Sequence, residues 1–86
     1  MPYIKPEERV FFRSLVDGMA NFVSRMNAGG LNYVVTKLIV EYWRQNPKYD
    51  TIATITGVLE NVKQEFYRRV AIKYEDDKQI ENGDVY

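Results

Sequence analysis

The strongest candidate for chemistry is a cluster of basic and aromatic residues in the C-terminal third of the chain, made of Tyr67, Arg68, Arg69 and Lys73. Cationic groups interleaved with tyrosine rings can hold a phosphate and stack on a base. The same pattern is typical of a solvated helix face, because Glu65 stands four residues before Arg69 and can form an ion pair with it. A solvated face is the leading interpretation, and a nucleotide or nucleic-acid contact is the alternative.

The sequence provides few groups for catalysis. It contains no His and no Cys, which removes the commonest general base at neutral pH, thiolate nucleophiles and Cys-based metal sites. Some of its acidic residues occur in adjacent pairs, such as Glu7/Glu8 and Asp76/Asp77. On a helix the members of such a pair point about 100° apart and do not share a proton as a catalytic pair does. We therefore predict that the chain is not an enzyme and holds no metal ion or cofactor.

Apolar residues recur at steps of three and four over most of the chain, which indicates amphipathic helices. The β-branched residues 34–36 leave a strand open as a less favoured alternative. Gly18 and Gly57 fall inside the expected helices, at a cost of up to about 1 kcal/mol each. We expect a close helix crossing at these glycines rather than a ligand cleft. The three expected helices cover residues 6–27, 31–46 and 50–78.

Capping and helix-breaking residues indicate where these helices end. Gly29-Gly30 and Pro47 are expected to stop the first and second helices. Asn32 and Asp50 are the expected N-caps of the second and third. Links this short favour antiparallel neighbours. The sequence therefore predicts an all-α fold, a three-helix bundle with a long C-terminal helix.

Length and charge indicate one domain with a distinct end. A chain of 86 residues with 45% hydrophobic and 28% charged residues is typical of a single globular domain. The formal net charge is zero, but residues 1–74 carry an excess of positive charge and residues 75–86 an equal excess of negative charge. The acidic end weakens any long-range attraction to DNA. We expect a helical domain over residues 1–78 and a flexible acidic tail over residues 79–86.

The composition also bears on where the protein works. No apolar run approaches the roughly 18 residues that a membrane span needs, and the first residues lack the apolar core of a signal peptide. The absence of Cys fits a reducing compartment. We expect a soluble cytoplasmic protein with no membrane partner.

Several short motifs are distinctive enough to act as a signature. They are Met1-Pro2-Tyr3-Ile4, Leu31-Asn32-Tyr33 with Thr36, Glu65-Phe66-Tyr67-Arg68-Arg69, Tyr74-Glu75-Asp76 and Asn82-Gly83-Asp84-Val85-Tyr86. Together they span nearly the whole chain and are similar to those of a family of small uncharacterised proteins found in bacteria and their phages. The resemblance implies a cytosolic setting and a mobile-element context. It implies no activity and no site.

The end of the third expected helix is the candidate contact surface. In an up-down-up bundle this helix overhangs the first by about 10 Å. The overhang is too apolar to leave in water, so a second copy could cover it through a two-fold contact. A helix that breaks near Ala71 and folds back on its own bundle would cover it as well. The expected contact residues are Val70, Ala71, Ile72 and Tyr74.

These observations lead to two functional hypotheses. The leading one is a non-enzymatic interaction module that forms a homo-oligomer or binds a protein partner. The alternative is a nucleic-acid or nucleotide-binding protein, such as a phage-type protein that sequesters a nucleotide, acting through the basic and tyrosine face of the third helix. Salt dependence separates the two, because phosphate contacts weaken steeply with salt and apolar association does not.

Overall fold

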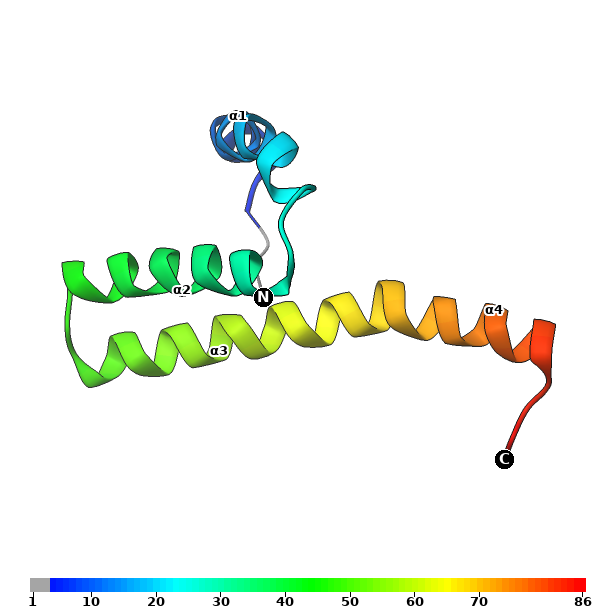
Figure 1. The fold of residues 1–86 in the computed structure, drawn as a ribbon. Helices are drawn as coiled ribbons and strands as arrows, with labels where there is room; N and C mark the ends of the chain where they lie inside the picture. The colour runs from blue at the N-terminus through cyan, green and yellow to red at the C-terminus, as the bar shows by residue number, and fades with distance from the viewer. Residues whose placement is uncertain (1–3) are drawn as a thin grey trace.

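The computed structural model describes residues 4–86, so the first three residues of the domain expected over 1–78 lie outside the described residues. The chain is all-α, with three helices of which the last is long, as the sequence predicts. No strand occurs in residues 4–86, and residues 34–36 are helical. The elements are α1 (Pro6–Val23), α2 (Ala28–Gln45), α3 (Tyr49–Phe66), the π-helical turn η1 (Tyr67–Ala71) and α4 (Ile72–Asn82), and the last three form one continuous helix of 34 residues (Figure 1).

The helix α1 begins and ends with recognisable local signals. Pro6 occupies its first turn, where a missing N–H costs nothing, and Glu7 and Glu8 follow at the positive end of the helix dipole. The helix ends at Val23, earlier than residue 27. The following amides turn back at once, since Arg25 N–H donates to the Phe22 carbonyl at 3.1 Å.

The start of α2 corrects two sequence predictions. Asn27 is the N-cap, and its side-chain Oδ1 accepts a hydrogen bond from the Gly30 N–H at 2.8 Å. Asn32, the expected cap, lies inside the helix and accepts a hydrogen bond from the Thr36 hydroxyl at 3.2 Å. Gly29 and Gly30 have no positive φ, so they form the first turn of α2 rather than the end of α1.

The start of α3 corrects a third prediction. Lys48 occupies the N-cap position, and Asp50 lies in the first helical turn, where its charge favours the helix without capping it. The Thr51 hydroxyl donates to the carbonyl of Asn46 and ties the α2–α3 link to the helix. Thr51 is 6% exposed and is the only buried residue in the described part of the chain.

The three helices form an open arrangement. The helices α2 and α3 pack as an antiparallel hairpin, whereas α1 lies across them near the start of α2 and makes only marginal contact with the rest of the described chain (Figure 1). The expected parallel course of the first and third helices is therefore wrong. The expected overhang is present, because η1 and α4 project beyond the hairpin by about 24 Å.

The chain has no interior of its own. None of the hydrophobic side chains in residues 4–86 is buried, and the radius of gyration is 16.6 Å, whereas a compact domain of this length has about 12 Å. The close helix crossing expected at Gly18 and Gly57 does not occur within the chain, since a Cβ added to either residue meets nothing within 4 Å. The apolar faces of all three helices thus remain uncovered.

Gly83 ends the last helix. Its φ of +86° suits glycine alone, and its N–H donates to the Gln79 carbonyl at 2.8 Å. Helical structure therefore covers residues 79–82 of the expected tail. The mobility of the remaining acidic residues stays a prediction.

Candidate functional site

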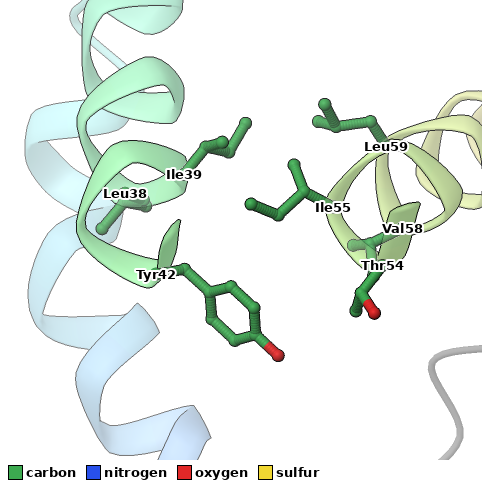
Figure 2. Close-up of a pocket in the computed structure, with 7 residues that line it drawn as sticks. All are labelled: Leu38, Ile39, Tyr42, Thr54, Ile55, Val58 and Leu59. Atoms are coloured by element: carbon green, nitrogen blue, oxygen red, sulfur yellow. The ribbon is translucent and has the colours of Figure 1, made fainter. Parts of the chain in front are cut away.

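An apolar groove lies between the two helices of the hairpin (Figure 2). We call it the α2–α3 groove. It encloses about 230 Å³, and none of its lining residues is charged. It is lined by Leu38, Ile39 and Tyr42 from α2 and by Thr54, Ile55, Val58 and Leu59 from α3.

The groove has a half-covered floor and open walls. Ile39 and Ile55 point toward each other across the space between the helices (Figure 2), and both are half-buried. Leu38 and Tyr42 are each 59% exposed. The lining is apolar apart from the hydroxyls of Tyr42 and Thr54, so the groove is suited to binding an apolar side-chain surface.

The helix α1 carries a second uncovered apolar surface, which we call the α1 stripe. Its residues are large, follow the three-four spacing of one helix face, and are all exposed. Phe22, for example, is 67% exposed. A helix with such a face is stable in water only when another surface covers it. The stripe consists of Phe12, Leu15, Val16, Met19 and Phe22.

The expected contact residues lie where the long helix leaves the hairpin. Val70 and Ala71 belong to η1, whereas Ile72 and Tyr74 belong to α4. Ala71 is half-buried, and the other three side chains are exposed. The helix does not break near Ala71; it continues through a π-helical turn, so the chain does not fold back to cover these residues.

The cations of the expected phosphate site are paired with carboxylates. Glu65 accepts hydrogen bonds from Arg68 at 2.9 Å and from Arg69 at 2.8 Å, so the predicted ion pair between Glu65 and Arg69 is confirmed. Lys73 lies 3.2 Å from a carboxylate oxygen of Asp77. All these groups are on the surface, where such pairs contribute little stability. The two carboxylates of Glu65 and Asp77 nevertheless offset two of the three positive charges, which weakens the field available to a phosphate.

The π-helical turn also changes which side chains share a face. A π turn inserts one residue, so everything after it rotates by about 100° relative to a continuous α-helix. Accordingly, the Tyr67 hydroxyl donates to Glu75, eight residues on, at 3.4 Å. The open hollow on this side has mixed charge, being lined by Glu60, Lys63, Gln64, Glu65, Tyr67, Arg68 and Ile72.

The paired arginines perturb one titrating group. Hydrogen bonds from Arg68 first, and then from Arg69, hold the pKa of the Glu65 carboxyl below its ordinary value of 4.5. The Glu65 side chain is 27% exposed, so water still screens the interaction. A lowered pKa keeps Glu65 ionised at neutral pH, which suits an ion-pair acceptor and does not suit a general acid.

The described part of the chain has neither a metal-binding cluster nor a membrane-spanning helix. Within residues 4–86, no three acidic side chains gather closely enough to hold a metal ion. No helix in the same residues combines the length and the apolar character needed to cross a bilayer.

Sequence reasoning did not identify the groove as a site. Leu38, Ile55 and Leu59 belong to the apolar stripes of the second and third expected helices. In the predicted three-helix bundle, such stripes form the core and not an open groove. The only available signal was the apolar stripe on each of the two segments, joined by a short link that favours antiparallel neighbours. A single stripe cannot show which surface covers it.

In a comparison with known protein families, residues 1–85 match a family model. The matching family is described as a domain of unknown function (DUF6899). No curated protein and no solved structure gave a match. The match covers almost the whole chain, so the open helical fold described above is that of a member of this family. The chain belongs to the DUF6899 family.

Proposed function

We propose that this protein is a non-enzymatic interaction module that acts as a homo-oligomer. The observation that carries the proposal is the absence of any buried hydrophobic side chain in residues 4–86 of a chain that is 45% hydrophobic. Burial of apolar surface is the main driving force for folding. A single copy in this arrangement has too little of it to offset the entropy of ordering the chain.

The amount of uncovered surface fits an obligate interface between copies. The chain exposes 7878 Å², whereas a compact monomer of this mass exposes about 5300 Å². Two copies that covered the excess would bury about 5000 Å² in total, which is typical of permanent homodimers. A second copy is the simplest partner, since it is always present and brings the same apolar faces.

The expected contact residues Val70, Ala71, Ile72 and Tyr74 are part of this proposal. Three of them are exposed at the base of the projecting helix, where nothing in the described chain covers them. A second copy placed there would extend the interface from the hairpin onto the projection. This gives the projection a role in assembly.

A nucleotide or nucleic-acid contact through Tyr67, Arg68, Arg69 and Lys73 has less support. Each of the three cations is within ion-pair distance of a carboxylate, and Tyr67 donates to Glu75. A phosphate would have to displace these partners and would gain little net charge.

Sedimentation equilibrium at micromolar concentration tests the proposal. We expect a mass of at least twice the 10.1 kDa of one chain and a melting temperature that rises with protein concentration. The same experiment in high salt is the control, since apolar association persists there and phosphate-type binding does not. A helical, cooperatively melting monomer of 10.1 kDa would overturn the proposal.

A further inference from the structure

We infer that the α1 stripe of one copy docks in the α2–α3 groove of a second copy, so that two chains exchange their first helices. The inference rests on the proposed homo-oligomer and specifies its contact. It joins the two apolar surfaces that the chain leaves uncovered on separate elements, the stripe around Leu15 and Met19 and the groove around Ile39 and Ile55.

The helices that carry the two surfaces have the same length. The helices α1, α2 and α3 each contain 18 residues, so each is about 27 Å long. An α1 helix laid along the hairpin would cover it from end to end and complete a three-helix layer. The long projection of η1 and α4 has no comparable stripe, because beyond Tyr74 its only apolar residue in α4 is Ile80, which is 85% exposed.

The link between α1 and α2 explains why the covering helix comes from another copy. Its amides are hydrogen-bonded in a compact turn, with Ser24 N–H donating to Ala20 at 3.0 Å and Met26 N–H donating to Val23 at 3.1 Å. Asn27 then caps α2 through Gly30. This turn sends α1 across the hairpin rather than back along it (Figure 1). Docking α1 on its own groove would require the link to change direction, whereas docking it on a second copy leaves the link as it is.

Reciprocal exchange also satisfies symmetry. In a two-fold dimer each chain gives one stripe and receives one, so both grooves and both stripes are covered at once. One-way docking would leave a free stripe at one end and a free groove at the other, and would propagate into open chains of copies. A closed dimer leaves neither surface free.

Cross-linking between two single-cysteine variants tests the inference, because the natural chain has no Cys. One variant carries Val16→Cys on the α1 stripe, and the other carries Thr54→Cys at the rim of the groove. The two are mixed in urea, refolded together and treated with a short bismaleimide. We expect a cross-linked product of twice the 10.1 kDa chain mass that contains one chain of each variant, identified by mass spectrometry.

A matched control replaces Val16→Cys with Ser14→Cys. Ser14 lies on the same helix, roughly 160° around its axis from Val16. Cross-linking of Ser14→Cys to Thr54→Cys should therefore be at least tenfold weaker than that of Val16→Cys. A chain carrying both Val16→Cys and Thr54→Cys, refolded alone at high dilution, reports whether the helix closes on its own groove instead. Each variant is first checked for helical content by circular dichroism.

The possible outcomes separate this inference from the proposed function. Strong mixed cross-linking that depends on Val16→Cys supports helix exchange. A sedimenting oligomer in which Val16→Cys cross-links no better than Ser14→Cys overturns the exchange and leaves the homo-oligomer standing. Cross-linking within single chains only, in an oligomer, likewise overturns it. A sedimenting monomer overturns both.

Discussion

The α2–α3 hairpin and the projection of η1 and α4 are held by different forces. The hairpin joins two amphipathic helices, and the half-buried Ile39 and Ile55 meet between them. The projection packs on nothing outside its own helix, and its side chains pair locally, as in the ion pairs of Lys73 with Asp77 and of Lys78 with Glu81. Such exposed pairs contribute only tenths of a kcal/mol each.

The difference shows how each region depends on its surroundings. A helix of 11 residues such as α4 is marginal by itself in water, and it is maintained because it continues α3 through η1. The hairpin has apolar surface to bury and gains from any partner that covers it. We therefore expect substitutions in the hairpin to alter stability, and substitutions at the tip of the projection to alter little.

The largest effect is expected from truncating the groove. Ile55→Ala removes a half-buried side chain that faces Ile39, and should lower the free energy of unfolding by about 2 kcal/mol or more. Ile80→Ala is the matched control on the 85% exposed tip of the projection, and should change it by less than about 0.5 kcal/mol. Urea titration at fixed protein concentration measures both. An equal loss of unfolding free energy in Ile55→Ala and Ile80→Ala would contradict the expected difference between the hairpin and the projection.

A charge at the base of the projection should weaken association. Val70→Glu or Ile72→Glu places a carboxylate on the proposed contact surface, and should raise the dissociation constant at least about tenfold, a cost of roughly 1.4 kcal/mol. Helical content by circular dichroism should stay nearly unchanged, since both positions are exposed. Ile80→Glu is the control and should leave the sedimentation profile as it is. Unaltered association in Val70→Glu and Ile72→Glu would confine the interface to the hairpin and α1.

The start of the hairpin distinguishes the true cap from the expected one. Asn27→Ala removes the hydrogen bond to the Gly30 N–H and should cost about 1 kcal/mol in thermal or urea unfolding. Asn32→Ala removes only an exposed side-chain hydrogen bond to Thr36 and should cost clearly less. The reverse order would mean that α2 begins later than Ala28.

The smallest effect is expected from Glu65 and depends on pH. Its pKa is lowered in the folded chain by hydrogen bonds from Arg68 and Arg69. The stabilisation is therefore complete above the unfolded pKa, near 4.5, and is lost as the pH falls through the lower folded value. Glu65→Gln should remove this part of the acid dependence. The stability curves of the two proteins should differ at neutral pH and converge in acid, and parallel curves would contradict the assignment.

Local features of the fold followed from the sequence to different degrees. The spacing of Phe12, Leu15 and Met19 sufficed to predict a helix, because periodicity is a property of a short segment. The helix ends did not follow as well, since glycine can end a helix or begin one, and Gly29 and Gly30 begin α2. The Gly30 N–H donates a hydrogen bond to the Asn27 side chain, which caps α2 and makes these glycines its first turn.

The sequence predicted the candidate site less well than it predicted the helices. The sequence indicated exposed apolar residues at the end of the third helix, and the structure leaves Val70, Ile72 and Tyr74 exposed there. It did not indicate the π-helical turn, because an inserted residue in a helix has no strong composition signal. With that turn in the helix, the Tyr67 hydroxyl donates to Glu75, eight residues on.

By itself, the sequence determined that the chain is helical, that it has three apolar stripes and that it contains no His or Cys for catalysis. These are properties of residue type and local spacing. The tertiary structure alone decided that α1 turns across the hairpin, that α2 and α3 form a groove, and that no stripe is buried within the chain. The physical reason is that a stripe fixes which face of a helix avoids water, whereas the direction of each link and the identity of the covering surface depend on contacts between distant residues.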